Sequence, residues 1–283
     1  MLSYLHSYHA GNFADVLKHI TLVHTLDYLA LKPRPYFYLD THSGPGLYRL
    51  STTEAQKNCE YLNGIAKLWQ ESKLPSAVAR YKEVIQECNA LESASGDLML
   101  YPGSPWIASN LTSNIDRLSL CELHPRENAS LKENFNNDRR INILHKDGFQ
   151  SAIAAMPPKE RRGLVLIDPP YEIKQDYERV VEVIEACHKR FATGTYAIWY
   201  PVVKRQTIDK MLKSLQNSGI KNIQVYELGL ENDTQERGMT SSGMIYINPP
   251  WTLWKTMEEC LPYLANQLAG DKGIYSMKQL VKE

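Results

Sequence analysis

Short apolar runs recur along the chain, and each of them ends at polar or turn-forming residues. The first run, residues 36–40, ends on the carboxylate of Asp40 and is followed by Thr-His-Ser-Gly-Pro-Gly, which is typical of a turn. Helical spacing of apolar residues separates most of the later runs, so the alternation predicts an α/β fold with a mostly parallel sheet covered on both faces. The seven predicted strands are residues 36–40, 118–122, 141–145, 163–168, 195–200, 223–228 and 244–247.

Two helical patterns complete this arrangement. Asn12 is a suitable N-cap for a helix over residues 13–26, where apolar residues recur every three or four positions. Residues 51–97 show no strand pattern; they open with Ser51-Thr52-Thr53-Glu54, which is typical of a capping box, and continue with helical spacing. We therefore predict a main domain of residues 1–50 and 98–283, with residues 51–97 as a small helical insertion after the first strand.

The composition fits a protein of the reducing cytoplasm. The chain has 283 residues, enough for a sizeable core, and its five cysteines lack the spacing of a zinc or redox site. The N-terminus has no basic start followed by an apolar run, and no segment approaches the roughly 18 apolar residues of a membrane span. We expect an unprocessed, cytoplasmic monomer with no membrane partner.

The formal net charge is zero, which argues against a protein that holds nucleic acid through many sequence-blind phosphate contacts. Basic residues nevertheless cluster within residues 132–146, 159–162 and 204–213. Each cluster could equally be an ordinary solvated helix face, so the charge pattern alone assigns no binding surface.

Polar residues stand at the ends of the first three predicted strands, where ligands bind in open α/β sheets. Asp40 precedes a loop with two glycines, which would let the backbone approach a cofactor, although the full G-x-G-x-x-G spacing of a dinucleotide site is missing. Glu122 could accept hydrogen bonds from the two hydroxyls of a ribose, or it could be a surface carboxylate. Asp147-Gly148 could face an adenine amino group, or it could be an ordinary turn pair.

The fourth strand runs into Asp168-Pro169-Pro170-Tyr171, which is a more specific signal. Two prolines remove two N–H donors, so the carboxylate and the carbonyls form an acceptor-rich site beside an aromatic ring. Such a site suits an exocyclic amine such as N6 of adenine, whose lone pair is delocalised into the ring until acceptors hold its hydrogens out of plane. Tyr171 could stack on the base, which would have to be flipped out of a paired strand.

A second motif of the same form, Asn248-Pro249-Pro250-Trp251, follows the last predicted strand. If the sheet is that of a methyltransferase, an enzyme class that acts on such amines, this strand runs antiparallel to the others, and its carboxyl end lies at the edge opposite the cofactor. We interpret residues 248–251 as a structural turn with a packing tryptophan, and we place the reaction at Asp168. Trp199 and Tyr200, which end the fifth strand, could line the base pocket, but we expect Trp199 to pack in the core.

Four histidines in the N-terminal part of the chain raise the question of a metal site. No cysteine and no H-E-x-x-H pattern accompanies them, so we expect no metal. On the first helix, Lys18 and His19 follow the cap closely and could face a ligand. Taken by themselves, a solvated lysine and a partly buried histidine are the better interpretation.

With these residues in view, the sequence resembles the RlmJ family of bacterial 23S ribosomal RNA adenine N6-methyltransferases over nearly its whole length. The matching motifs include His9-Ala10-Gly11-Asn12, Ala14-Asp15-Val16-Leu17-Lys18-His19, Tyr38-Leu39-Asp40-Thr41-His42, Tyr101-Pro102-Gly103-Ser104-Pro105, Glu122-Leu123-His124-Pro125, Asp147-Gly148-Phe149, Asp168-Pro169-Pro170-Tyr171-Glu172 and Trp199-Tyr200-Pro201-Val202-Val203.

The resemblance implies a Rossmann-like class I methyltransferase fold that uses S-adenosyl-L-methionine, yields S-adenosyl-L-homocysteine and modifies adenine 2030 of 23S ribosomal RNA. It implies cofactor contacts for His19, His42, Ser104, Glu122, Asp147 and Gly148. For His19 this replaces the interpretation as a partly buried histidine without a ligand. The implied catalytic residues are Asp168, Pro169 and Tyr171, and the implied RNA contacts are Tyr4, His6 and Lys18.

Two other functions fit the same residues. A DNA adenine methyltransferase would use the same four-residue motif, because contacts to the 2′-hydroxyl cannot be seen in the sequence. A non-catalytic RNA-binding protein could keep the fold as a scaffold. The second alternative would be expected to lack Asp168 or Glu122, and the chain retains both.

Overall fold

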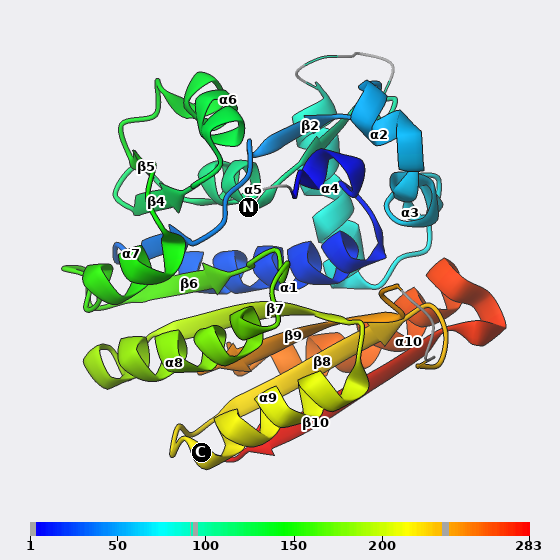
Figure 1. Cartoon of the computed structure of the whole chain (residues 1–283). Helices are drawn as coiled ribbons and strands as arrows, with labels where there is room; N and C mark the ends of the chain where they lie inside the picture. The colour runs from blue at the N-terminus through cyan, green and yellow to red at the C-terminus, as the bar shows by residue number, and fades with distance from the viewer. Residues whose placement is uncertain (1–3, 91, 93–95, 234–237) are drawn as a thin grey trace.

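The computed structural model describes residues 4–90, 92, 96–233 and 238–283. One eight-stranded sheet dominates this part of the chain, in the order β10-β8-β9-β7-β6-β1-β4-β5, and a two-stranded sheet pairs β2 with β3. Figure 1 shows the large sheet with helices on both sides. The strands are β1 (Phe37–Asp40), β2 (Leu47–Arg49), β3 (Leu100–Pro102), β4 (Arg117–Cys121), β5 (Ile141–Leu144), β6 (Gly163–Ile167), β7 (Thr195–Val202), β8 (Ile223–Gly229), β9 (Ser241–Ile247) and β10 (Ile274–Val281).

The α/β methyltransferase fold is confirmed, but the strand number differs from the predicted seven. The predicted strands are β1 and β4 to β9, and β1 and β4 to β7 pair in parallel. β9 runs antiparallel to both β7 and β8, as expected for the last of the seven. The eighth strand, β10, adds antiparallel to β8. Its residues are mostly half-exposed or exposed, so this edge strand lacks the apolar run by which the others were recognised.

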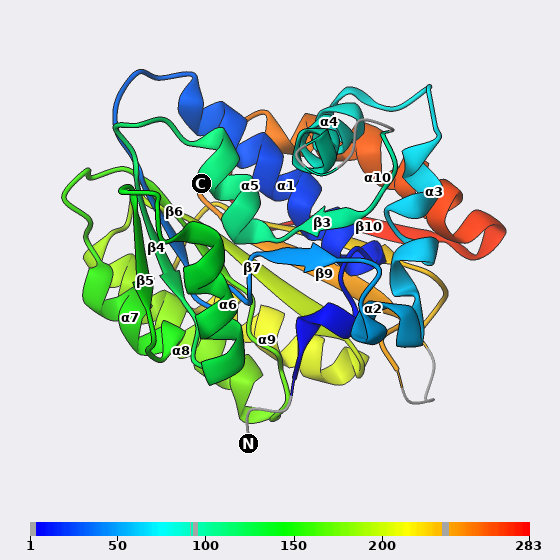
Figure 2. The same ribbon diagram turned by 90° about the horizontal axis from the view of Figure 1, so that it is seen from above.

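Alternate residues along each strand belong to two separate cores, because successive side chains of a strand point to opposite faces of the sheet. In β6, Leu164 and Leu166 belong to the core beneath α1, α4, α5, α6 and α10, whereas Val165 and Ile167 belong to the core beneath α7, α8 and α9. Figure 2 shows most of these helices on opposite sides of the sheet. The helices are α1 (Phe13–Ala30), α2 (Thr53–Asn58), α3 (Ala66–Trp69), α4 (Ser76–Ala90), α5 (Ser104–Leu111), α6 (Pro125–Phe135), α7 (Gly148–Ala155), α8 (Gln175–Arg190), α9 (Arg205–Asn217) and α10 (Leu253–Ala269), with the 3₁₀ turns η1 (His6–Tyr8), η2 (Glu60–Asn63) and η3 (Gly270–Lys272).

Helix α1 is almost completely buried between the sheet and the neighbouring helices. Asn12 caps it as predicted: the side-chain oxygen accepts hydrogen bonds from the backbone N–H groups of Ala14 and Asp15, each 3.0 Å away. Lys18 and His19 are buried as well as the apolar residues. A helix that buries charged and polar side chains needs partners for them, and these partners form the site described below.

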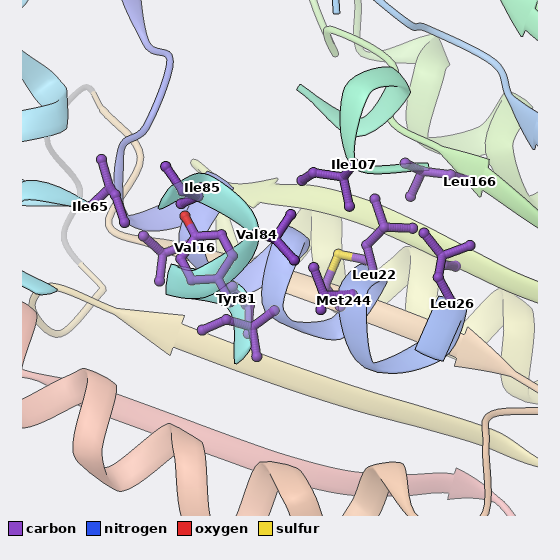
Figure 3. Close-up of a cluster of buried hydrophobic side chains, with 14 of the residues drawn as sticks. Val16, Leu22, Leu26, Ile65, Tyr81, Val84, Ile85, Ile107, Leu166 and Met244 are labelled. Atoms are coloured by element: carbon purple, nitrogen blue, oxygen red, sulfur yellow. The ribbon is translucent and has the colours of Figure 1, made fainter. Parts of the chain in front are cut away.

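The described part of the predicted insertion, residues 51–97, forms α2, η2, α3 and α4 with loops between them and contains no strand; residues 91 and 93–95 lie outside the described residues. Thr52, one position later than the predicted Ser51, is the N-cap of α2. Side chains of α4 such as Tyr81, Val84 and Ile85 pack into the same core as α1, as Figure 3 shows. The short strands β2 and β3 enclose the insertion and were not predicted. Whether residues 51–97 form a separate subdomain stays a prediction.

Within the described residues, no helix combines the length and the apolar character needed to cross a bilayer.

Candidate active site

A cavity of about 770 Å³ lies at the carboxyl ends of β1, β4, β6 and β7. This is the edge of an open α/β sheet at which ligands bind, and β1 lies beside β6 at the point where the strand order reverses. Every residue that the resemblance assigned to the cofactor, to catalysis or to the RNA contributes to the cavity wall, whereas Asp40 and Tyr200, also singled out from the sequence, do not. The contributing residues are Tyr4, His6, Lys18, His19, His42, Ser104, Glu122, Asp147, Gly148, Asp168, Pro169 and Tyr171.

Asp168, directly after β6, is joined to the first helix through Lys18. The Nζ atom of Lys18 lies 2.6 Å from Oδ2 of Asp168 and 2.9 Å from Oδ1 of Asp15. Burial alone would lower the pKa of Lys18, but the two carboxylates raise it above its usual value. The ammonium group therefore stays charged and holds the Asp168 carboxylate at the cavity wall.

Asp15 also receives donors from the N-terminal segment. Oδ2 of Asp15 lies 2.8 Å from Nε2 of His6 and accepts a hydrogen bond from the backbone N–H of Gly11. The other ring nitrogen of His6 lies 2.8 Å from the hydroxyl oxygen of Tyr4. A continuous polar chain thus runs from Tyr4 at the mouth of the cavity to Asp168, and all its links are between 2.6 and 2.9 Å long.

The ring of Tyr171 is fixed among aromatic neighbours. Its hydroxyl donates to the carbonyl oxygen of Trp199 at 2.7 Å, and its ring centroid lies 4.4 Å from that of Tyr177 and 5.9 Å from that of Trp199. Tyr171 has a φ of 50°, in the left-handed region that non-glycine residues rarely adopt. The backbone after the two prolines therefore turns sharply. Trp199 is half-buried and lines the cavity, so the expected core-packing role describes only part of its environment.

Glu122 is held at the end of β4 by backbone donors. Its two carboxylate oxygens accept hydrogen bonds from the N–H groups of Gly44 at 2.8 Å and His124 at 2.7 Å. Burial raises the pKa of Glu122, and the two N–H groups oppose that rise. Because each carboxylate oxygen can accept more than one hydrogen bond, Glu122 keeps acceptor capacity toward the cavity.

Asp147 caps α7 and is oriented by an arginine. Its Oδ1 accepts from the N–H of Gln150 at 3.1 Å, and its Oδ2 lies 2.6 Å from Nη2 of Arg179. Burial tends to raise the pKa of Asp147, but Arg179 and the N–H donor lower it overall. At Gly148 a Cβ would lie 1.8 Å from the carbonyl oxygen of Thr41, so glycine is required for α7 to pack against the loop after β1.

The two predicted cofactor histidines are uncharged near neutral pH. Burial lowers the pKa of His19 to about 3 and that of His42 to about 4. The Nδ1 atom of His19 lies 2.7 Å from the hydroxyl oxygen of Tyr101, while its buried Nε2 has no hydrogen-bond partner among the described residues. A buried ring nitrogen without a partner at the wall of a cavity is a position at which a ligand could bind.

Ser104 contacts the strand end that the sequence singled out first. Its hydroxyl donates to Oδ2 of Asp40 at 2.6 Å, and the hydroxyl of Tyr38 donates to the same atom at 2.9 Å. Burial raises the pKa of Asp40 to about 6 in spite of these bonds. Asp40 itself does not line the cavity, so it supports Ser104 from behind.

Comparison with known proteins identifies the family. The family model described as "Ribosomal RNA large subunit methyltransferase D, RlmJ" matches residues 33–281. The chain belongs to the RlmJ family. It is 53% identical to ribosomal RNA large subunit methyltransferase J of Haemophilus influenzae and 49% identical to the protein of that name from Escherichia coli K12; each match covers 95% of this chain and 94% of the relative. A crystal structure of a Legionella pneumophila protein is 38% identical, with a TM-score of 0.87, and covers 96% of this chain and 98% of that one.

Membership of the RlmJ family makes the chain a ribosomal RNA methyltransferase that modifies the large-subunit RNA. This agrees with the resemblance noted from the sequence, and it favours an RNA substrate over the DNA alternative. In the part of the chain that the structure describes, no group of three or more His, Cys, Asp or Glu side chains could hold a metal ion.

Several residues of this RlmJ-family site were not predicted. Asp15, Tyr101 and Arg179 hold Lys18, His19 and Asp147 in place, and all three are side chains that the sequence left without a role. Asp15 had a signal, because it lies three positions before Lys18 and therefore on the same side of the helix. The contacts of Tyr101 and Arg179 join residues 82 and 32 positions apart, and no local pattern shows them.

The second proline motif lies away from the cavity, as expected. Nδ2 of Asn248 donates to the carbonyl oxygens of Ala192 and Gly194, and the Asn248 carbonyl accepts from the hydroxyl of Thr195 at the start of β7. The motif therefore closes a turn at the opposite edge of the sheet. The expected packing role of Trp251 is wrong, since this residue is 80% exposed.

Proposed function

We propose that the protein transfers a methyl group from S-adenosyl-L-methionine to N6 of an adenine in 23S ribosomal RNA, and that the adenine is the one numbered 2030. The observation that carries this proposal is the position of Asp168. Its carboxylate stands at the cavity wall beside the Lys18 ammonium and is followed by two prolines and the ordered ring of Tyr171. This arrangement supplies acceptors to an amine and an aromatic face to a base.

In the proposed mechanism, Asp168 and the carbonyl oxygen of Pro169 accept hydrogen bonds from the two N6 hydrogens. Holding both hydrogens out of the ring plane favours a pyramidal nitrogen whose lone pair can attack. S-adenosyl-L-methionine, held by the residues named below, would supply the electrophilic methyl group, and S-adenosyl-L-homocysteine would be the second product. The proton released from N6 passes to Asp168 or to water. Most of the rate then comes from positioning and from the charges already in place.

The residues present fit this cofactor. His19 lines the cavity, and its buried Nε2 lacks a hydrogen-bond partner among the described residues. Glu122 presents a carboxylate suited to the ribose hydroxyls, and Asp147 at the start of α7 presents one suited to the adenine amino group. We propose that His19, His42, Ser104, Glu122, Asp147 and Gly148 hold the cofactor.

On the substrate side we propose that Tyr4, His6 and Lys18 contact the RNA. They line the cavity on the side of the N-terminal segment and belong to the polar chain that ends at Asp168. Aromatic and imidazole rings can stack on an unstacked base. Flipping the adenine out of a strand costs the least free energy when the adenine is already unpaired. We further propose a cytoplasmic monomer that needs no metal, with residues 51–97 as a helical subdomain.

Labelled methyl transfer tests this function. The purified protein is incubated with radiolabelled cofactor in two separate reactions. One contains 23S ribosomal RNA from cells that lack the gene, and the other contains adenine-containing DNA. We expect incorporation into the RNA alone, as N6-methyladenosine at one position. Incorporation into DNA would support the DNA alternative, and cofactor binding without transfer would support the non-catalytic one.

A further inference from the structure

Glu60, from the helical insertion, lines the cavity and contacts the turn that precedes α1. Its Oε1 lies 2.7 Å from Nδ1 of His9, and its Oε2 accepts a hydrogen bond from Nδ2 of Asn12 at 3.0 Å. Asn58, on the insertion itself, donates to Oε1 at 3.4 Å. One half-buried carboxylate therefore binds side chains from both ends of the turn that precedes α1.

The backbones make the same connection. The N–H of Ile65 donates to the carbonyl oxygen of Gly11 at 2.9 Å, and a Cβ on Gly64 would lie 2.0 Å from that oxygen. Gly64 allows η2 and the residues after it to lie directly on the turn formed by residues 9–12. Gly11 itself has a φ of 80° in this turn. The insertion thus contacts the turn through backbone and side chains together.

Both partners of Glu60 lead to the proposed RNA side of the cavity. The ring of His9 is stacked on that of Tyr4, with centroids 5.6 Å apart and an interplanar angle of 9°. Asn12 is the N-cap of α1, and six residues later this helix places Lys18 against Asp168. Movement of the turn would therefore displace both the Tyr4 ring and the beginning of α1.

We propose that Glu60 is a positioning residue, through which the helical insertion holds the N-terminal segment in the geometry that receives the target nucleotide. This inference rests on the proposed function of the cavity and assigns the insertion a role in it. Glu60 acts through His9 and Asn12 and is not itself assigned a contact with the reacting atoms. The hydrogen bonds of Glu60 go to His9, Asn12 and Asn58, and none goes to Glu122, Asp147 or His19, which we propose for the cofactor.

The pKa shifts of Glu60 and His9 agree with an ion pair between the two side chains. The bond to Glu60 raises the pKa of His9 against the lowering effect of burial, and Asp15 adds to the rise. The bonds from His9 and Asn12 lower the pKa of Glu60 overall, although burial opposes this. A charge-assisted bond between two half-buried groups constrains the geometry of both more strongly than a neutral one.

The test compares two equivalent substitutions in the full-length protein. Glu60→Gln removes the charge that binds His9, whereas Glu54→Gln removes a different ion pair of the insertion, with Arg126; neither Glu54 nor Arg126 lines the cavity. In methyl transfer to 23S ribosomal RNA, we expect the KM for RNA to be about tenfold higher for Glu60→Gln than for the wild-type protein, as loss of a charged hydrogen bond would cause. The dissociation constant for S-adenosyl-L-methionine, measured by calorimetry, and the activity of Glu54→Gln should stay within about twofold of wild type.

A second variant separates positioning from general damage to the fold. His9→Gln removes the same ion pair from the other side, so adding Glu60→Gln to it should raise the KM for RNA by much less than Glu60→Gln does alone. An unchanged KM in Glu60→Gln, fully additive effects, or a parallel loss of cofactor affinity would each overturn the inference. A wild-type protein that methylates no RNA would instead overturn the proposed function, which keeps the two failures distinct.

Discussion

The Nζ atom of Lys18 lies 2.6 Å from Oδ2 of Asp168, although the two residues are 150 positions apart. The lysine side chain is 6% exposed, so its charge is stable there only because Asp15 and Asp168 both contact it. This ion pair joins helix α1 to the end of β6 and places the proposed substrate side of the cavity against the proposed catalytic carboxylate.

Replacement of Asp168 should separate chemistry from cofactor binding. In Asp168→Ala the amine loses an acceptor and the Lys18 ammonium keeps only Asp15, so we expect methyl transfer to fall on the order of a thousandfold. The cofactor residues lie on other elements, and the dissociation constant for S-adenosyl-L-methionine should stay within about tenfold of wild type. Radiolabel transfer and calorimetry measure the two quantities. Undiminished turnover with normal cofactor binding would show that Asp168 is not the catalytic acceptor.

His19 allows its two ring nitrogens to be tested separately. In His19→Asn the amide can replace Nδ1 against Tyr101 but cannot reach the position of Nε2, so we expect cofactor affinity to fall about tenfold, as loss of a buried hydrogen bond would. His19→Gln can place an amide near the Nε2 position and should lose less. Equal affinities in the two variants and the wild type, measured by calorimetry, would rule out a cofactor contact at Nε2.

Asp15 should contribute to stability in a pH-dependent way. This carboxylate is 1% exposed and binds His6, Gly11 and Lys18, so Asp15→Asn should cost about 3 kcal/mol in free energy of unfolding at pH 7.

The sign of the pH effect follows from the pKa of Asp15. Burial alone would raise it, but His6 and Lys18 hold it well below the usual 3.8. The stabilisation is therefore complete above about pH 4 and is lost as the pH falls through the lowered pKa. Urea unfolding of wild type and variant should differ at pH 7 and converge in strong acid. A constant difference at all pH values would contradict this account.

Asp40 should have the opposite effect. Burial raises its pKa to about 6 from the usual 3.8, so the folded protein binds a proton more readily and loses stability as the pH rises through this interval. Asp40→Asn removes the titration but can still accept from Ser104 and Tyr38. We therefore compare the free energy of unfolding of the variant minus that of wild type, measured with urea. This difference should be about 1 to 3 kcal/mol larger at pH 7.5 than at pH 4. If the two proteins showed the same pH dependence, Asp40 would not be the titrating group.

Much of the fold could be predicted because its determinants are local. Apolar runs marked the seven strands of the methyltransferase sheet, and Asn12 marked the start of α1. β10 was missed because a polar, half-exposed edge strand has no apolar run, and its pairing with β8 depends on residues about 50 positions away. The exposure of Trp251 was also missed, since side-chain type does not determine whether a neighbour covers it.

The sequence by itself determined the strand ends, and with them the acidic residues Asp168, Glu122 and Asp147 that share one edge of a parallel sheet. The position of Asn248 at the other edge was predicted from the antiparallel last strand of methyltransferase sheets, and the antiparallel pairing of β9 with β7 confirms it. Only the tertiary structure decided which partners hold these groups: Lys18 against Asp168, Tyr101 against His19, and Glu60 against His9 and Asn12. Such contacts depend on how segments that are distant in the sequence pack together, and the spacing of residues along the chain does not predict that packing.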